Sequence, residues 1–163
     1  MFQFASAVSD LLGLRQARSF YRSSTFVWCV ALGAAWFCVL PHLVALEPLP
    51  WHRIASAAFL LAVVWQPIVE ELVFRGGLQG FLSFREWGRQ PFVGVSIANL
   101  LTSVLFAMAH TATHPLMWAS LTFIPSLLFG IVRDRSGSVY PPIALHIIYN
   151  GGYFLLTGGA SLI

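Results

Sequence analysis

Five stretches of the chain are apolar over nearly the length needed to cross a bilayer, and short polar segments separate them. A transmembrane helix needs about 20 predominantly apolar residues, because the hydrocarbon layer is about 30 Å thick. The stretches cover residues 25–46, 54–71, 91–110, 116–132 and 139–162. None of the joints resembles a linker between domains, and no internal repeat is evident. We therefore expect a single all-α domain over residues 1–163: a polytopic membrane protein with about five transmembrane helices in a core at residues 25–162.

The N-terminal segment, residues 1–22, has a different pattern. Phe2, Ala5, Val8 and Leu12 fall on one stripe of a helix, and three arginines follow by residue 22. An amphipathic helix next to basic residues is typical of a helix that lies on a membrane surface. A signal peptide is not favoured, because its basic residues would precede the apolar part. We predict an interfacial helix with a basic flank.

Composition supports the membrane interpretation. Hydrophobic residues make up 58% of the chain and charged residues 9%, against about 25% charged residues in an average soluble domain. So few charges do not cover the surface of a water-soluble fold of this size. The lipid bilayer is therefore the first expected partner.

Positive charge predicts the orientation. Every basic residue is an arginine, and with a cytoplasmic N-terminus the cytoplasmic side receives all but one of those outside the spans: Arg15, Arg18, Arg22, Arg85, Arg89, Arg133 and Arg135. Only Arg53 falls on the other side, in agreement with the positive-inside rule. The pI near 9.3 is then a topology signal, and no nucleic-acid partner is expected.

The second apolar stretch carries charges where a membrane span should have none. Glu70 and Glu71 end this stretch and Arg75 follows closely, although an ionised group at bilayer depth costs about 3 kcal/mol on insertion scales. Glu71 and Arg75 are four residues apart, which suits an ion pair on one helix face. Glu70 points about 100° away and has no such partner, so it is the candidate general base. The alternative is a structural salt bridge, with Glu70 facing a water-filled crevice.

Two further spans carry polar residues at helical spacing. His110 ends the third stretch four residues after Phe106, and His146 and Asn150 share a face of the fifth. With about 1.5 Å of rise per residue, Glu70 and His110 come to similar depths, so a carboxylate and an imidazole can meet. Each histidine alone is compatible with a structural role. The convergence of three polar sites favours a catalytic centre.

These residues form three ordered patterns: Glu70-Glu71-x-x-x-Arg75, Phe106-x-x-x-His110 and His146-x-x-x-Asn150. Together they resemble the three motifs of the CAAX prenyl endopeptidase and bacteriocin-processing family of intramembrane proteases, over about residues 57–152. The resemblance implies a small prokaryotic, glutamic-type intramembrane endopeptidase of the cell membrane. It implies a protein or peptide substrate with a hydrophobic or membrane-associated segment, as in C-terminal processing, sorting-signal cleavage or bacteriocin maturation. Because the chain has fewer spans than eukaryotic members, a prenylated substrate is not specifically expected.

The resemblance also suggests roles for the motif residues. Glu70 matches the residue that activates water, and His110 matches its companion on that water. His146 and Asn150 match the donors that stabilise the oxyanion, which is often the largest electrostatic contribution to such a reaction. The supporting residues are Glu71, Arg75 and Phe106. No cofactor is required by this assignment.

Two other functions use the same side chains. A zinc-dependent protease would coordinate the metal through Glu70, His110 and His146, since catalytic zinc takes three protein ligands; however, the chain has no HExxH motif. A proton-coupled carrier or a non-catalytic membrane chaperone would use the acids and histidines as a relay. The span count is low for the inverted repeats of carriers.

Overall fold

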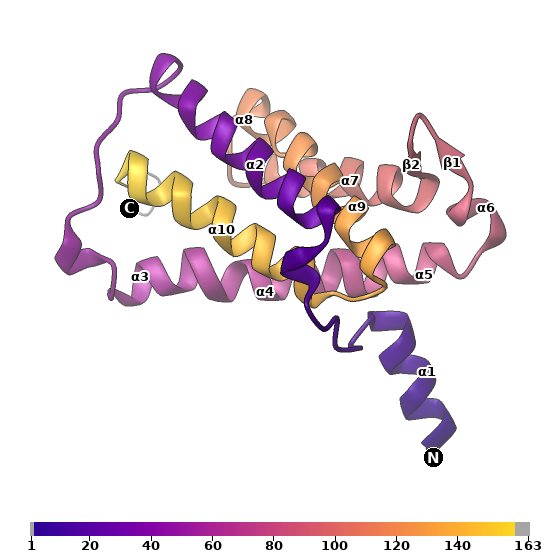
Figure 1. The fold of residues 1–163 in the computed structure, drawn as a ribbon. Helices are drawn as coiled ribbons and strands as arrows, with labels where there is room; N and C mark the ends of the chain where they lie inside the picture. Colours follow the sequence, from indigo (N-terminus) through magenta and orange to yellow (C-terminus); the bar gives the residue numbers. More distant parts are fainter. Residues whose placement is uncertain (1, 159–163) are drawn as a thin grey trace.

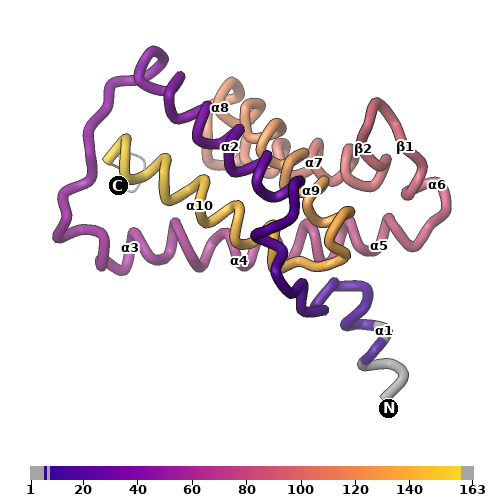
Figure 2. The backbone as a smooth tube through the Cα atoms, in the orientation of Figure 1, coloured from indigo at the N-terminus to yellow at the C-terminus, as the bar shows by residue number. Residues whose placement is uncertain are grey.

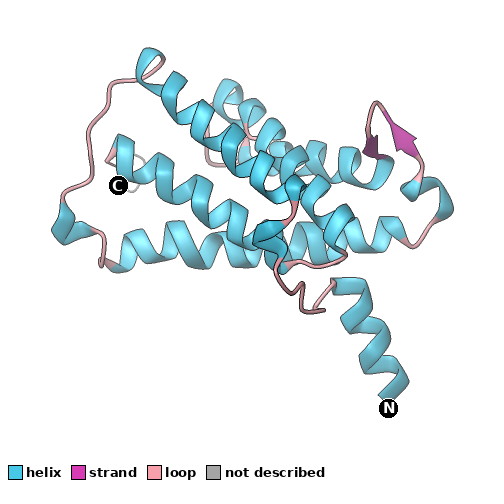
Figure 3. Cartoon of the chain, in the orientation of Figure 1, coloured by secondary structure: helices cyan, strands magenta, loops and turns pink. Residues whose placement is uncertain are grey.

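The computed structural model describes residues 2–158, and almost all of its regular structure is helical (Figures 1 and 3). In chain order the elements are α1 (Phe2–Leu12), η1 (Phe20–Arg22), α2 (Ser24–Val39), η2 (Leu40–His42), η3 (Trp51–Arg53), α3 (Ala57–Leu60), η4 (Leu61–Trp65), α4 (Gln66–Glu71), η5 (Leu72–Gln79), α5 (Gly80–Ser83), α6 (Glu86–Arg89), β1 (Pro91–Phe92), β2 (Val95–Ser96), α7 (Ile97–His110), α8 (Leu116–Leu121), α9 (Phe123–Ser136) and α10 (Tyr140–Thr157). The segments η1, η2 and η3 are 3-10 helices, whereas η4 and η5 are π-helices.

Three helical segments among the described residues are long and apolar enough to cross a membrane: Ser24–His42, Ala57–Ser83 and Leu116–Ser136. The helix α7 is apolar but has only 14 residues. The helix α10 has 18 residues, and its apolar character is interrupted by polar side chains such as His146 and Asn150. The all-α membrane class is confirmed, while three spans, not five, meet these criteria.

The third predicted stretch begins differently from the expectation of a helix over residues 91–110. Pro91 and Phe92 pair with Val95 and Ser96 in an antiparallel hairpin whose two loop residues, including Gly94, have positive φ, as in the tight turns that join strands. The helix α7 starts only at Ile97, after the Ser96 hydroxyl accepts a hydrogen bond from the Asn99 amide at 3.0 Å. This capping bond is what fixes the later start.

The remaining boundaries shift for identifiable reasons. The fourth stretch divides at Thr122 into α8 and α9, because the ring of Pro125 disfavours a continuous helix at the preceding turn. It then continues past residue 132 and ends at Gly137, a left-handed C-cap with φ of 66°. The fifth helix, α10, ends at Gly158 with φ of 69°. The rest of the predicted stretch 139–162 lies outside the described residues.

The helix α10 occupies the middle of the bundle. It packs against α2, α4, η4 and α9, while α7 packs along α9 and η5; the tube in Figure 2 traces these segments. One core cluster comprises Phe26, Cys29, Phe129, Val132 and Leu145. Polar motif residues from α4, α7 and α10 are therefore brought toward the interior from three directions.

The helix α1 projects away from the bundle (Figure 1), and its C-terminal end packs against the bundle. A Cβ atom on Gly80 would collide with the Leu11 carbonyl oxygen, and one on Gly76 would lie 3.2 Å from the Leu12 carbonyl oxygen. These two glycines let the backbone of α1 approach the helix that carries the glutamates. An α1 helix is confirmed at the predicted position, and its location on a membrane surface stays a prediction.

Candidate active site

The two glutamates lie on α4, a six-residue α-helical segment between the π-helical segments η4 and η5. The Glu71 side chain is fully buried, and the Glu70 side chain is 18% exposed. π-Helical segments are rare and are found mainly at functional sites. This difference in exposure agrees with the expectation that Glu71 is paired with Arg75 and that Glu70 has no ion-pair partner in its own helix.

Glu71 and Arg75 form the ion pair expected from their spacing, with Arg75 Nε 3.2 Å from Glu71 Oε2. Arg75 Nη2 also donates to the hydroxyl oxygen of Ser126 at 2.8 Å and to its carbonyl oxygen at 3.1 Å. The guanidinium lies over the rings of Phe106 and Phe129, 5.2 and 6.0 Å from their centroids. Five contacts from α7, α9 and its own helix thus hold a fully buried arginine in place.

His146 reaches both glutamates from α10. Its Nδ1 lies 3.0 Å from Glu71 Oε1, and its Nε2 lies 3.8 Å from Glu70 Oε2. The imidazole stacks on the Phe129 ring, with centroids 4.6 Å apart and an interplanar angle of 24°. Because an ionised carboxylate only accepts hydrogen bonds, Nδ1 carries the proton in this contact. Glu71 therefore bridges Arg75 and His146, a link for which the sequence held no direct signal.

Glu70 has a neutral partner in its own helix, which the expectation about ion pairs did not include. Gln66 Nε2 donates to Glu70 Oε1 at 2.8 Å. This bond fixes one carboxylate oxygen and leaves the other, Oε2, on the side of His146. The separation of four residues was the signal in the sequence for a contact between Gln66 and Glu70. Gln66 was not predicted as a site residue, because it is uncharged and forms no ion pair.

His110 occupies the last residue of α7, half-buried beside Phe106. Its Nδ1 lies 2.9 Å from the Phe106 carbonyl oxygen, and the two rings are 4.5 Å apart. A carbonyl cannot donate, so Nδ1 is the donor and Nε2 of the neutral ring is left as an acceptor. The Phe106 ring also lies 6.0 Å from the His146 ring. Phe106 thus lies next to both histidines, and within residues 2–158 no direct contact joins His110 to Glu70.

Asn150 lies one turn after His146 on α10, and both side chains contact the helical segment Ala57–Ser83. Its Nδ2 donates to the Ala62 carbonyl oxygen in η4 at 3.1 Å. The structure therefore gathers Glu70, Glu71 and His146 into one cluster. His110 and Asn150 flank that cluster without direct contact to the glutamates.

Ser126 and Phe129 were not recognised from the sequence as site residues. Both lie on α9 and are buried, and they contact Arg75 and His146 respectively. A serine and a phenylalanine in an apolar stretch carry no distinguishing pattern, since most such residues only pack. Their place in the site depends on which helices are neighbours.

The side chains of the zinc alternative, Glu70, His110 and His146, are not arranged around one point. Across the part of the chain that the structure describes, no group of three His, Cys, Asp or Glu side chains is placed to hold a metal ion. Glu70, Glu71 and His146 do lie together, but Glu71 is already paired with Arg75. The donor set in this arrangement does not fit a three-ligand zinc site.

Comparison with known proteins adds two findings. A family model described as type II CAAX prenyl endopeptidase Rce1-like matches residues 51–152, a range that contains every predicted site residue. The chain is also 33% identical over 90 residues to an uncharacterized 24.3 kDa protein of Escherichia coli. That alignment covers 55% of this chain and 37% of the relative. No solved structure matches the chain.

Proposed function

Because this chain belongs to the Rce1-like family of type II CAAX prenyl endopeptidases, we propose that it is an intramembrane endopeptidase. It hydrolyses a peptide bond near the membrane in a protein or peptide substrate. The observation that carries the proposal is the cluster in which His146 lies 3.0 Å from one buried glutamate and 3.8 Å from a second, less buried one. Ionisable side chains inside a helical membrane protein cost free energy of insertion, so they are retained where they serve a function.

Glu70 is the proposed general base. Gln66 holds Oε1, so Oε2 is the oxygen that takes a proton from the attacking water. His110 Nε2, the acceptor nitrogen of the neutral ring, is the proposed second contact to that water. A positioned base contributes about 10²–10⁴-fold to the rate of such reactions.

His146 and Asn150 are the proposed donors to the oxyanion that forms on the attacked carbonyl. With Nδ1–H directed at Glu71, His146 donates from Nε2 only when both ring nitrogens are protonated, and Glu71 stabilises that imidazolium. An amide nitrogen carries two hydrogens. Asn150 can therefore donate one to Ala62 and keep the other for the substrate.

The proposed substrate carries a hydrophobic or membrane-associated segment next to the cleaved bond. C-terminal processing, cleavage of a sorting signal and maturation of a bacteriocin or peptide all present such a segment. In the proposed topology, α7 and α10 cross the membrane in addition to the three long apolar segments. The protein is embedded in the inner membrane of a prokaryotic cell, and its N-terminus lies in the cytoplasm. These assignments rest on the arginine distribution.

Isotope incorporation provides the test of the proposed activity. The protein in lipid nanodiscs is incubated in H₂¹⁸O with peptides that carry a C-terminal apolar helix, and fragments are analysed by mass spectrometry. Hydrolysis places one ¹⁸O atom in each new C-terminal carboxylate, because the nucleophile is water. Intact peptides across a varied set would contradict an endopeptidase and favour the carrier or chaperone alternative.

Chelation is expected to leave the activity unchanged, because the proposed steps use only Glu70, His110, His146 and Asn150. Cleavage is measured before and after exhaustive treatment with a strong chelator, with metal content determined on the same samples. Zinc, when bound, lowers the pKa of its water ligand and supplies the nucleophile. Activity lost on chelation and restored by stoichiometric zinc would overturn the metal-free mechanism.

A further inference from the structure

A cavity of about 520 Å³ lies apart from the glutamate cluster, and none of the proposed catalytic residues lines it. Its wall combines the end of α1, the C-terminal part of the helix Ala57–Ser83, the last turn of α9 and the start of the β2–α7 segment. The cavity thus lies where two of the candidate membrane spans end. This is the level of lipid head groups if the two helices cross the bilayer.

Positive charge is in excess in the cavity wall. Three arginines, Arg15, Arg89 and Arg133, face two aspartates. Both aspartates already have partners: Asp10 pairs with Arg15 at 2.8 Å, and Asp134 accepts from Gln79 and from Ser96, each at 2.7 Å. The wall therefore carries one more positive than negative charge, and its carboxylates are engaged.

Arg133 is half-buried and donates to backbone oxygens: Nη2 to Leu11 at 3.2 Å and Nε to Arg75 at 3.3 Å. Within residues 2–158 it has no ion pair with a carboxylate, and the same holds for Arg89. Carbonyl oxygens satisfy N–H groups but do not neutralise the charge. Guanidinium groups that have no ion pair with a carboxylate suit a phosphate, which they recognise with paired hydrogen bonds.

One residue of the cavity wall has an unsatisfied acceptor. Gln79 lines the cavity and is 1% exposed. Its Nε2 donates to Gly130 and Asp134, whereas Oε1 has no hydrogen-bond partner among the described residues. Buried polar atoms are seldom left unpaired, so a ligand with a hydroxyl donor would complete this side chain.

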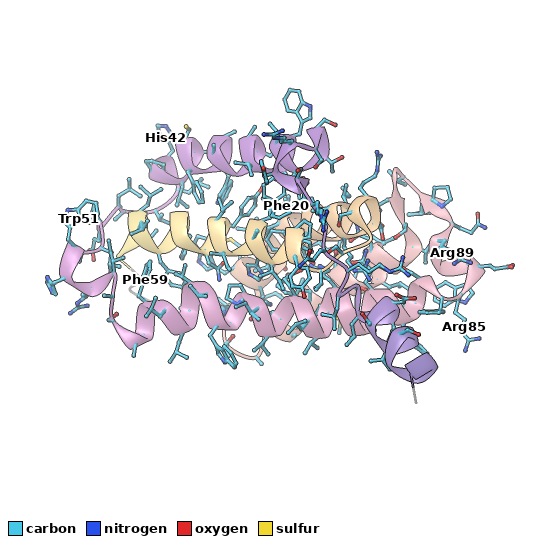
Figure 4. All side chains as sticks on the ribbon, turned by 60° about the horizontal axis from the view of Figure 1, so that its bottom comes forward. Phe20, His42, Trp51, Phe59, Arg85 and Arg89 are labelled. Atoms are coloured by element: carbon cyan, nitrogen blue, oxygen red, sulfur yellow. The ribbon has the colours of Figure 1, made fainter. Side chains whose placement is uncertain are left out.

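Leu11 and Phe84 add apolar surface to the same wall. Figure 4 places Arg89 at one end of the bundle, opposite Trp51 and Phe59. From these features we propose that the cavity binds the head group of an anionic glycerophospholipid. The arginines bind the phosphodiester, a head-group hydroxyl donates to Gln79 Oε1, and the acyl chains leave past Leu11 and Phe84. Phosphatidylglycerol has this chemistry.

The test compares lipid retention in nanodiscs of phosphatidylcholine with and without phosphatidylglycerol, by native mass spectrometry and by the thermal unfolding midpoint. Arg15→Gln/Arg89→Gln removes two cavity arginines, and Arg18→Gln/Arg85→Gln removes two arginines outside the cavity. Both variants lose the same charge, so nonspecific attraction to anionic lipid falls equally. We expect the first to lose about tenfold in phosphatidylglycerol affinity, as expected for lost charge-assisted hydrogen bonds, and the second to bind like the unmodified protein.

Equal retention by the two variants would overturn the proposed site. If the cavity double variant does not fold in phosphatidylcholine, the exposed Arg89→Gln and Arg85→Gln single variants provide the same comparison. Phosphatidylmethanol, which keeps the phosphodiester but lacks hydroxyl donors, is expected to bind more weakly than phosphatidylglycerol. If inorganic phosphate or glycerol phosphate reproduces the stabilisation, the ligand is a soluble phosphate and the lipid assignment is wrong.

Discussion

Glu70→Gln is expected to reduce peptide cleavage by about 10²–10⁴-fold, the contribution of a positioned general base. The substitution keeps the size of the side chain and its capacity to hydrogen-bond with Gln66, but an amide cannot take a proton from water. Because Glu70 is 18% exposed and the close ion pair of Arg75 is with Glu71, stability should change little. Rates measured on purified protein in nanodiscs, with the unfolding midpoint on the same samples, check both statements.

Glu86→Gln is the matched control, since it removes an exposed carboxylate at the start of α6. It should cleave at the unmodified rate. Cleavage by Glu70→Gln within a factor of about 10 of the unmodified protein would remove Glu70 from the role of base. An unfolding midpoint that falls sharply in Glu70→Gln would instead mark the residue as structural.

Arg75→Ala is expected to lower the free energy of unfolding by about 3–5 kcal/mol, because it leaves the buried Glu71 charge without its cation. Glu71 is fully buried, and among residues 2–158 His146 Nδ1 would remain as its one partner. Denaturant titration of the detergent-solubilised protein measures the loss. Activity should fall as well, since Glu71 and His146 share the contact at 3.0 Å.

Arg135→Ala serves as control for Arg75→Ala, because Arg135 is exposed in the last turn of α9. Its effect should remain within about 0.5 kcal/mol, as for most surface substitutions. The double variant Glu71→Gln/Arg75→Met removes both charges and should regain part of the lost stability. A single Arg75→Ala variant as stable as the unmodified protein would show that the buried pair does not stabilise the fold.

Local spacing predicted the parts of the site that depend on one helix. The Glu71–Arg75 pair follows from a separation of four residues, and it survives because its contact spans a single turn. The contact of Gln66 with Glu70 obeys the same spacing rule, but it was not predicted, because neither the pair nor Gln66 alone carries a charge pattern. Both contacts lie within one helix, so neither requires knowledge of the neighbouring helices.

The depth of the site residues along their helices, and the choice of which helices pack together, were less predictable from the sequence. The comparison of Glu70 with His110 assumed a straight α-helical rise, whereas η5 is π-helical and α7 starts at Ile97 instead of near Phe92. The contact of His146 with Glu71 depends on α10 packing against α4. Apolar stretches do not specify which helices become neighbours, so the contributions of Ser126 and Phe129 from α9 could not be derived from their sequence.

The two π-helical segments have a further consequence for the helix that carries the glutamates. A π-helix bonds residue i to i+5, so each such segment accommodates an additional residue and changes the angular phase of the side chains beyond it by roughly 100°. The segment α4 lies between two such changes. Its orientation toward α10 is thus set independently of the outward stripe upstream, which contains Leu60, and of the one downstream, which contains Phe81. Substitutions at lipid-facing positions before η4 or after η5 can therefore leave the orientation of the two carboxylates on α4 unchanged.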